Sequence, residues 1–204
     1  MKRQNLLKLF FAAATTLSIN AHALSTGGLF VEPMITYEKG DTTTKYPVFN
    51  DSKGDVDGFG LGARLGLHIG EIFFAGIDGR YAMPKFKDSN VGYDAKAVST
   101  NYGPVVGVQT PVAGLRVWGS YVLGGSLNPE KSGNYNFKYD DAKGYRVGAG
   151  FYVAAVSLNV EYQDLKYGNA TLEELGGFTP GTSFDDVELQ NKSWVASISF
   201  PVEL

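Results

Sequence analysis

Charged residues alternate with apolar residues along several short segments of this chain. In the segment 59–69, Arg64 stands between two apolar residues, and Asp78 and Arg80 occupy matching positions in the segment that follows. Side chains at alternate positions share one face of an extended strand. An isolated charge in an enclosed, poorly hydrated space is very costly, so these groups are expected to form ion pairs. Such a network could gate an ion or plug the space.

Catalytic chemistry has little to build on in this sequence. Cysteine is absent, which excludes a thiol nucleophile, a disulfide framework and a Cys/His metal cage. Of the two histidines, His22 lies near the amino terminus and His68 lies on the polar face of its segment. Acyl transfer needs a nucleophile, a base and an orienting group within hydrogen-bond reach. We therefore expect no enzyme, no catalytic residue and no cofactor, with His68 filling space.

Two polar segments, 39–57 and 165–191, carry carboxylates that could bind calcium or bridge to lipopolysaccharide through divalent ions. The carboxylates in question are Asp51, Asp55, Asp57, Glu173, Glu174, Asp185, Asp186 and Glu188. The first segment lacks the glutamate that completes an EF-hand loop, and acidic loops are usually just solvated. We expect no dedicated metal site.

The composition narrows the class of protein. The chain has 204 residues, a formal net charge of −3 and 19% charged residues, which argues against an electrostatic nucleic-acid binder. It also has 26 glycines, roughly twice the average share of ~7%. Glycine at this abundance disfavours a helical protein.

The amino terminus has the anatomy of a secretory signal peptide. Lys2 and Arg3 precede an apolar stretch, and Ala21 and Ala23 supply the small residues of a cleavage site. We predict a signal peptide over 1–23 and a single domain over 24–204. After residue 23 no apolar run is long enough for a transmembrane helix, so a membrane location would require strands.

Eight segments show the period-two alternation of half-buried strands. In 59–69 the odd positions are apolar, while the even positions are glycine, arginine and histidine. Glycine and a few arginines suit a crowded interior better than open water. The eight segments are 31–38, 59–69, 73–81, 102–109, 115–123, 145–152, 156–163 and 194–204.

The connections between these segments alternate strictly in length. Tight turns are expected near 70–71, 110–114 and 153–155, and long polar loops at about 39–57, 84–98, 126–142 and 165–191. Short turns on one side and long loops on the other are typical of outer-membrane barrels. The sequence therefore predicts an all-β fold, an eight-stranded antiparallel up-and-down transmembrane β-barrel. One helical turn is expected at 171–175.

Each predicted strand places one aromatic residue on its apolar face near the long-loop end. An aromatic girdle at the membrane interface explains this placement. Its predicted members are Tyr37, Phe59, Tyr81, Tyr102, Tyr121, Tyr145, Tyr162 and Trp194. The alternatives are a soluble β-sandwich or a soluble lipid-binding barrel, whose apolar residues would face inward.

Three stretches carry a resemblance to a known family: FGLGARLGLHIG, IFFAGIDGRYAM and SWVASISFPVEL. They resemble the small eight-stranded outer-membrane β-barrels, which include the OmpA transmembrane domain, OmpX, Ail, NspA and opacity-type proteins. The resemblance implies that the last strand carries an assembly signal read by the barrel-assembly machinery, here Ile198, Phe200, Val202 and Leu204. The family pattern ends in an aromatic residue, whereas this strand ends in Leu204, and Pro201 removes one ladder donor.

The inward faces of the predicted strands bring the charges into the barrel lumen. The predicted lumen charge network comprises Glu32, Arg64, Asp78, Arg80, Arg146 and Glu161, with Arg116, Gln109, Asn159 and Gln163 nearby. Eight strands leave a lumen that side chains can fill. A structural plug is therefore favoured over an ion gate.

The predicted function is a non-enzymatic outer-membrane protein with a charge-plugged lumen, a structural role in the envelope and adhesion-like surface interactions. The alternative is a narrow porin-like channel, or one of the OmpW kind, for small or hydrophobic solutes. Expected partners are outer-membrane lipid, lipopolysaccharide contacted through lysines, the barrel-assembly machinery and a surface ligand. We expect a monomer that binds no nucleic acid.

Overall fold

The computed structural model describes residues 27–46, 50–89, 92–110, 114–153, 155–178, 181–184 and 186–204. The predicted signal peptide over 1–23 lies outside these residues. Within the described residues no helix is long and apolar enough to cross a membrane.

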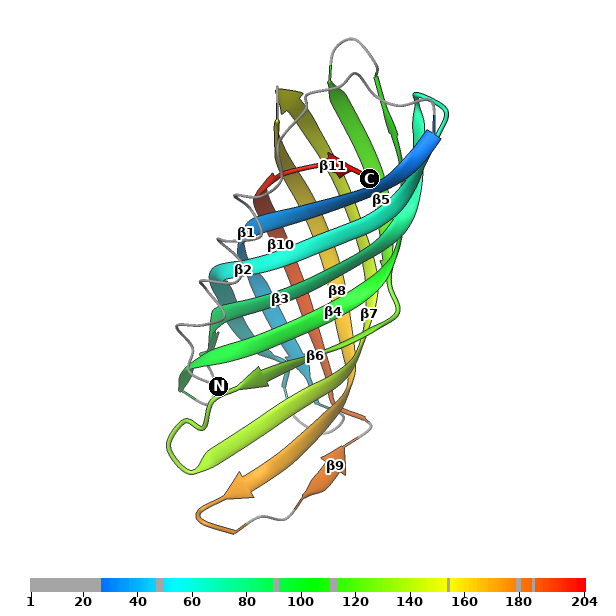
Figure 1. The fold of residues 1–204 in the computed structure, drawn as a ribbon. Coiled ribbons are helices and arrows are strands. Elements are labelled where there is room, and N and C mark those ends of the chain that lie inside the picture. The colour runs from blue at the N-terminus through cyan, green and yellow to red at the C-terminus, as the bar shows by residue number, and fades with distance from the viewer. Residues whose placement is uncertain are drawn as a thin grey trace, which may run out of the picture.

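All of the named elements are strands, and they form one antiparallel sheet that closes on itself (Figure 1). The strands are β1 (Gly27–Lys45), β2 (Ser52–Ile69), β3 (Phe73–Asp88), β4 (Tyr93–Gln109), β5 (Leu115–Val122), β6 (Gly124–Pro129), β7 (Tyr135–Val153), β8 (Val156–Leu175), β9 (Thr182–Phe184), β10 (Glu188–Ser199) and β11 (Val202–Glu203). β5 and β6 together form one wall, interrupted at Leu123, because both pair with β4. β11 likewise pairs with β1, as β10 does.

The sheet closes where β1 pairs with β10, from Met34 opposite Ser199 to Lys45 opposite Glu188. The ring therefore has eight walls, in the order β1, β2, β3, β4, β5 with β6, β7, β8 and β10. The short strand β9 pairs with β8 at Ala170–Leu172, on the edge that β10 occupies further down, and so continues the β10 wall. The predicted eight-stranded barrel is confirmed. Because closure pairs every wall with two neighbours, no long backbone edge remains in the ring.

The segments that connect neighbouring strands differ between the two ends of the barrel. At the end that we call the turn end, β2 and β3 are joined through Gly70–Ile72, where Gly70 has a φ of 65° that suits glycine. At the other end, which we call the loop end, the strands run much further than the sequence suggested. β1 and β2 stay paired up to Thr44 opposite Ser52.

The predicted long loops at 39–57, 84–98, 126–142 and 165–191 are therefore wrong over most of their length. These polar segments continue the strands beyond the aromatic residues, and β8 reaches Leu175. The predicted helical turn at 171–175 is also wrong, since these residues pair with β7 as strand. Their composition is as polar as that of loops, but buried and exposed side chains still alternate through these segments, as in strands.

The outer surface between the two ends is an apolar belt. Its side chains point away from the lumen and are mostly about half exposed or more, as Phe59 at 67% and Ile77 at 63% illustrate. Contiguous exposed apolar surface of this extent is foreign to soluble monomers and matches a lipid-facing surface. Other members of the belt are Leu61, Leu65, Leu67, Val106, Val117, Val147, Leu158, Val160 and Ile198.

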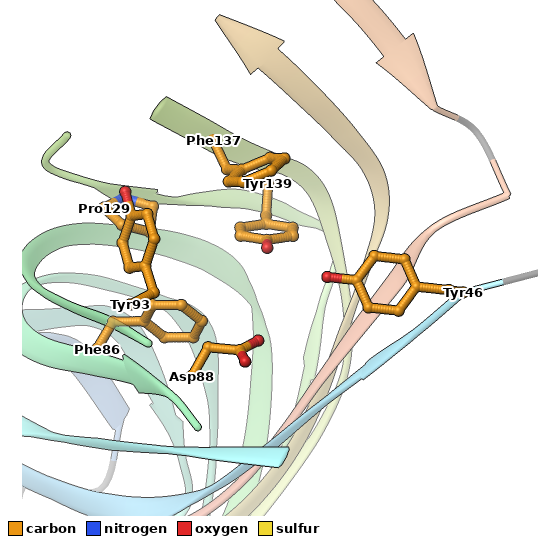
Figure 2. A pocket seen from close by; sticks show the side chains of 7 residues that line it. All are labelled: Tyr46, Phe86, Asp88, Tyr93, Pro129, Phe137 and Tyr139. Carbon is orange, nitrogen blue, oxygen red and sulfur yellow. The ribbon is translucent and has the colours of Figure 1, made fainter. Parts of the chain in front are cut away.

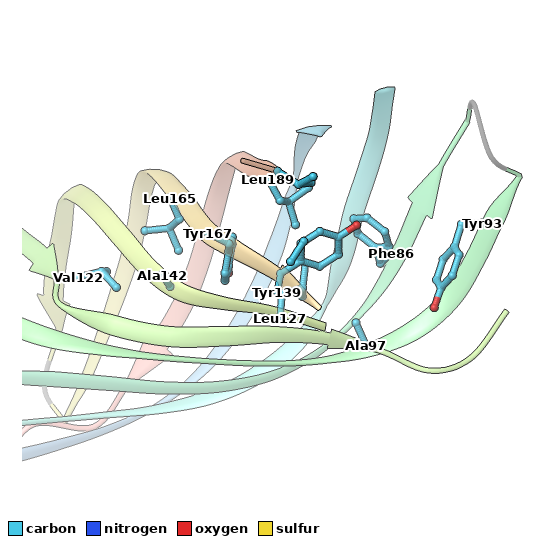
Figure 3. Packing of buried hydrophobic residues seen from close by; sticks show 12 residues of the cluster. Phe86, Tyr93, Ala97, Val122, Leu127, Tyr139, Ala142, Leu165, Tyr167 and Leu189 are labelled. Carbon is cyan, nitrogen blue, oxygen red and sulfur yellow. The ribbon is translucent and has the colours of Figure 1, made fainter. Parts of the chain in front are cut away.

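Inside the barrel, two kinds of side chain follow each other along the axis. The part level with the apolar belt is filled mainly by buried charged and polar groups, with a small buried cluster of Phe30, Phe74, Val105 and Trp118 beside them. The part toward the loop end is filled by a buried apolar cluster (Figure 3), which comprises Phe86, Tyr93, Ala97, Val122, Leu127, Tyr139, Ala142, Leu165, Tyr167, Ala170, Val187 and Leu189. The sequence alone does not predict this second core, because the outward residues of the same segments are polar.

Candidate functional site

The charged part of the lumen is built from neighbouring strands in register. Glu32 on β1 lies opposite Arg64 on β2, and Arg64 lies opposite Asp78 on β3. Arg64 donates from Nη1 to Glu32 Oε2 at 3.4 Å and from Nη2 to Asp78 Oδ2 at 3.1 Å. All three side chains are buried. One strand register thus sets up the first row of ion pairs.

Asp78 is the centre of this network. Besides Arg64 it accepts a hydrogen bond from Arg80 Nε at 3.1 Å and one from Arg146 Nη1 at 3.2 Å. Arg80 also reaches Glu161 on β8, whose two carboxylate oxygens each lie 2.7 Å from Nη2. The structure therefore brings all six predicted network residues together. Three arginines share one buried carboxylate, so its removal would leave several cations without their partner.

Arg116 belongs to the same network, although the sequence analysis places it only near the six predicted members. Its Nη1 and Nη2 each donate to a Glu32 oxygen at 2.8 Å, which is a bidentate pair. Ser199 donates to the same carboxylate at 2.6 Å. The alternation had already placed Arg116 inward. Its partner on β1 became visible only with the closed ring, because the two residues are 84 positions apart.

The ion pairs cross the lumen. In the ring order, β5 stands opposite β1 and β3 stands opposite β8. The Arg116–Glu32 pair therefore follows one diameter of the barrel, and the Arg80–Glu161 pair follows another. Short side-chain bonds thus cross two diameters of the lumen at this level.

Aromatic rings close the lumen beside these charges. The Arg64 guanidinium carbon lies 4.9 Å from the Trp118 ring centre and 5.7 Å from that of Phe74. Arg116 lies 5.1 Å from the Phe74 ring. Trp118 also donates from Nε1 to Glu161 Oε2 at 3.1 Å. Cation–π contacts in a dry site add to the ion pairs and hold the guanidinium planes in place.

His68 lies in the lumen near the turn end. Its ring stacks on Phe30 with the ring centres 4.6 Å apart, and its Nδ1 lies 3.5 Å from Glu203 Oε1. His68 is therefore packed as an aromatic ring in the lumen.

Above the ion pairs, an uncharged hydrogen-bond layer surrounds one carboxylate. Glu38 Oε1 accepts from Gln163 at 2.7 Å, from Asn191 at 2.8 Å and from Ser193 at 2.7 Å. The next inward residues on β8 and β10 are Leu165 and Leu189, which are fully buried. Glu38 therefore marks the level where the lumen changes from polar to apolar.

At the loop end the lumen opens into a small pocket (Figure 2). Its walls are Tyr46, Phe86, Asp88, Tyr93, Pro129, Phe137 and Tyr139. Sequence reasoning missed this site, because its residues fall in the segments interpreted as loops. The signal that could have found it is the inward parity of aromatic residues in 84–98 and 126–142.

The predicted girdle residues lie on the outward face. Tyr37 and Phe59 are paired across β1 and β2, with ring centres 4.9 Å apart, and Tyr162 and Trp194 are paired across β8 and β10 at 5.4 Å. Phe59, Tyr81, Tyr102, Tyr121, Tyr145 and Trp194 are exposed. Tyr37 and Tyr162 are half-buried against their partners.

The final segment lies against β1. The Phe200 amide donates to the Pro33 carbonyl at 2.9 Å and the Leu204 amide to the Leu29 carbonyl at 2.8 Å. Ile198, Phe200 and Leu204 are exposed, and Val202 is half-buried. The four predicted assembly-signal residues thus lie along the same edge of β1, and the strand is interrupted between β10 and β11, where Pro201 lies.

The described residues contain no group of three or more His, Asp or Glu side chains placed to hold a metal ion. Several carboxylates at the loop end pair with lysines instead, as in Lys45–Glu188 at 3.2 Å and Lys85–Asp94 at 3.1 Å. Asp185 lies outside the described residues.

Comparison with solved structures identifies the fold. The outer membrane protein OprG from Pseudomonas aeruginosa matches with a TM-score of 0.55 and 8% identity, covering 90% of this chain and 99% of OprG. This chain has the fold of a small outer-membrane β-barrel. The attachment invasion locus protein Ail of Yersinia pestis (16% identity, 86% and 99% coverage, TM-score 0.48) and Neisserial surface protein A (13%, 86% and 99%, 0.43) are also similar. No family model and no curated protein matches the barrel.

Proposed function

We propose that this chain is a non-enzymatic outer-membrane protein whose lumen is closed by its charge network. In this proposal the barrel stabilises the envelope and presents its loop end to the exterior. The observation that carries it is the pair of ion pairs along two diameters, Arg116–Glu32 and Arg80–Glu161. The apolar belt supports the membrane location, since it would be unstable in water.

Planar-bilayer recording of the purified full chain tests the closed lumen. Wild type is expected to give no sustained single-channel steps, because bonded side chains fill the lumen. The double variant Arg80→Ala/Glu161→Ala removes one diameter and is expected to give measurable conductance. The matched control is Lys85→Ala/Asp94→Ala, which removes an ion pair from the outer surface and should stay silent. Sustained wild-type steps that change in Arg64→Ala would contradict the proposal.

A second candidate is a narrow channel for small hydrophobic solutes. It is favoured by the apolar cluster above the charge network and by the short pairing of β6 with β7 at Leu127 opposite Tyr139. Uptake of a hydrophobic dye into vesicles that contain the barrel would support it. A rate equal to that of empty vesicles would reject it.

The surface role is proposed from the loop end. Outward lysines there, such as Lys39 and Lys85, lie beyond the aromatic girdle, where lipopolysaccharide phosphates would lie. We expect purified lipopolysaccharide to bind the wild-type barrel more tightly than a variant with Lys39, Lys85 and Lys87 changed to Ala. Equal binding would remove lipopolysaccharide from the proposed partners. The barrel-assembly machinery is a further proposed partner, through the strand that ends at Leu204.

A further inference from the structure

The barrel wall is higher on one side of the loop end, where β7 and β8 run beyond the other strands (Figure 1). The pairing of β8 with β10 reaches Tyr167 opposite Leu189, whereas β8 continues to Leu175. Beyond β10, β8 pairs with β7 on one edge and with β9 on the other. The residues 135–139, 169–178 and 182–184 therefore form a small sheet, which we call the flap.

One face of the flap is apolar and continues the buried apolar cluster of the loop half. Ala170 and Tyr139 belong to that cluster. Phe184 lies directly opposite Ala170, and residues opposite each other in an antiparallel pair share a face. Leu172 and Phe137 also lie opposite each other, each two positions from a cluster member, so they share this face as well. We call it the inner face of the flap.

The tip of the flap is a tight hairpin. The Leu175 amide donates to the Phe178 carbonyl at 2.8 Å, and the Phe178 amide donates to the Leu175 carbonyl at 3.0 Å. Gly176 and Gly177 between them have φ values of 58° and 91°, which suit a two-residue hairpin turn. The turn thus holds Leu175 and Phe178 side by side in a fixed arrangement.

A β-bulge turns this apolar pair to the inner face. Glu173 is the extra residue of β8, because its neighbours Leu172 and Glu174 lie opposite consecutive residues of β7. Without the extra residue, strict alternation from Leu172 would place Leu175 on the outer face. With it, Leu175 and its partner Phe178 extend the apolar inner face to the tip.

This apolar face is exposed far from the membrane. Phe178 is 80% exposed, Leu175 43% and Phe184 42%. Leu175 lies roughly 30 Å beyond the girdle residue Tyr162 along the barrel axis, since strand residues rise ~3.3 Å and strands of such barrels tilt by ~45°. Lipid therefore covers the belt but does not reach these side chains. Exposed apolar patches in water mark sites of protein contact.

A free backbone edge lies beside the inner face. Among the described strands, β9 pairs with β8 alone, whereas the walls below it pair on both sides. All three residues of β9, Thr182, Ser183 and Phe184, are exposed. The unpaired N–H and C=O groups of such an edge are a template for another extended backbone. The flap thus offers backbone groups and apolar side chains together.

We propose that the flap binds an extended segment of a partner protein, which adds to β9 as a further strand and lays apolar side chains on the inner face. This inference rests on the proposed surface role and names its site and the chemistry of its ligand. Edge pairing requires an extended backbone, and alternate side chains of that backbone share a face. The described residues of the inner face are uncharged, so the matching side chains of the partner are apolar.

A second copy of this chain is a poorer match for the same edge. Two β9 strands paired antiparallel would be related by an axis normal to the sheet. Because the sheet normal lies in the plane of the membrane, the two barrels would stand in membranes that face each other. Such pairing has its own signature, since it would cluster vesicles that carry the barrel.

A soluble peptide of alternating valine and threonine, with a lysine at one end and a glutamate at the other, is the probe. Its control has the same side chains but carries a methyl group on each central amide, which removes the backbone donors. The labelled peptides are titrated into the full chain in phosphatidylglycerol nanodiscs, and empty nanodiscs measure binding to lipid. Wild type is expected to bind the probe with a Kd of ~100 µM or less and the methylated peptide ~10-fold or more weakly. The amides of 182–184 should gain protection from hydrogen exchange.

Two variants place the same charge on opposite faces of β9. Phe184→Lys brings a lysine to the inner face, where the partner's apolar side chains would bury it, and is expected to weaken peptide binding ~10-fold or more. Ser183→Lys brings it to the outer face and should change binding by less than ~2-fold. Phe178→Ser removes the ring at the tip and should weaken binding several-fold, even if Phe184→Lys disturbs β9.

Three results would each overturn the proposal: no saturable binding up to ~1 mM peptide, equal binding of the methylated peptide, or equal affinities of Phe184→Lys and Ser183→Lys. Clustering of vesicles by the barrel alone, lost in Phe184→Lys, would identify a second copy as the occupant instead. The proposed surface role fails separately. Protection of the flap from protease added to whole cells would refute that role and leave peptide binding by the purified barrel unchanged.

Discussion

The two halves of this barrel distribute polar and apolar side chains in opposite ways. On β3, outward Ile77 in the belt is 63% exposed, whereas outward Lys85 lies eight residues further toward the loop end. The inward residues of β3 change from charged to apolar in the same direction, from Arg80 to Phe86, which is 2% exposed. The half with the belt is mainly polar inside, apart from the small cluster around Phe74 and Trp118, and apolar outside. The loop half is apolar inside and polar outside, as in a soluble protein.

This difference shows that the surroundings of each half decide what must hold it together. Outward apolar residues in lipid gain nothing by leaving it for the lumen, so the belt half depends on specific ion pairs and hydrogen bonds for its interior. The loop half stands in water and gains from burying apolar side chains. One half is therefore sensitive to loss of a charge, and the other to loss of a methyl group.

The largest expected effect is in the charge network. Asp78→Ala leaves Arg64, Arg80 and Arg146 without the carboxylate that they share. Removing one partner of a buried ion pair costs ~3–5 kcal/mol, so we expect a loss of that size in the free energy of unfolding. Urea titration of the barrel in lipid vesicles measures it.

The control for this prediction is a carboxylate of the loop half. Asp55 is exposed on the outside of β2, and Asp55→Ala should change the free energy of unfolding by less than ~0.5 kcal/mol. Equal effects of Asp78→Ala and Asp55→Ala would show that the network carries no stability, which contradicts the proposed contrast.

Leucines on β8 test the apolar side of the comparison. Leu165 is fully buried in the loop half, whereas Leu158 is 54% exposed in the belt. Leu165→Ala leaves a cavity and is expected to cost ~2–5 kcal/mol. Leu158→Ala leaves no cavity in the protein and should cost less than that. Hydrogen exchange should show faster opening at the loop end in Leu165→Ala. The reverse order of the two costs would place the apolar core in the wrong half.

Exchanging outward residues along β3 tests the outer surfaces. Ile77→Lys places a charge near the middle of the apolar belt and is expected to cost ~2–4 kcal/mol of folding free energy in lipid. Lys85→Ile, on the same face beyond the girdle, should change it by less than ~1 kcal/mol, since its main loss is a surface pair with Asp94. Folding measured in vesicles gives both values. A cost for Lys85→Ile as large as that for Ile77→Lys would mean that the membrane reaches further along β3 than the belt does.

Much of the belt half was predictable because its pattern is local. Period-two alternation assigns each residue to one face without knowledge of the ring. This placed Arg64, Asp78 and Glu161 in the lumen, and Phe59 and Trp194 outside. What alternation does not supply is the cross-lumen partner. Arg116 meets Glu32 only because the barrel closes between β1 and β10.

The loop half was missed because its outward residues are polar, as loop residues are. Thr42 and Thr44 alternate inward between polar neighbours, and this weak pattern reads as a turn-rich segment. Tyr139 adds a second difficulty, since the change of facing at Asp141 breaks the parity on which the assignment rests. The pocket therefore lies where local sequence patterns carry the least information about the closed structure.

The smallest expected effect concerns Asp141 on β7. Odd-numbered residues face the lumen before Asp141, and even-numbered residues face it afterwards. Asp141→Gly keeps the φ of 59° without strain and loses only an exposed ion pair with Lys143, so the free energy of unfolding should change by less than ~1 kcal/mol. Asp141→Val cannot adopt this conformation cheaply and should lose ~1–2 kcal/mol. The difference between the two variants isolates the backbone, because both lack the carboxylate. Tyr139 should lose its inward position in Asp141→Val alone, seen as new labelling of its ring by an aqueous tyrosine reagent. Equal stability and equal labelling in the two variants would mean that side-chain packing, and not the backbone at Asp141, turns Tyr139 into the pocket.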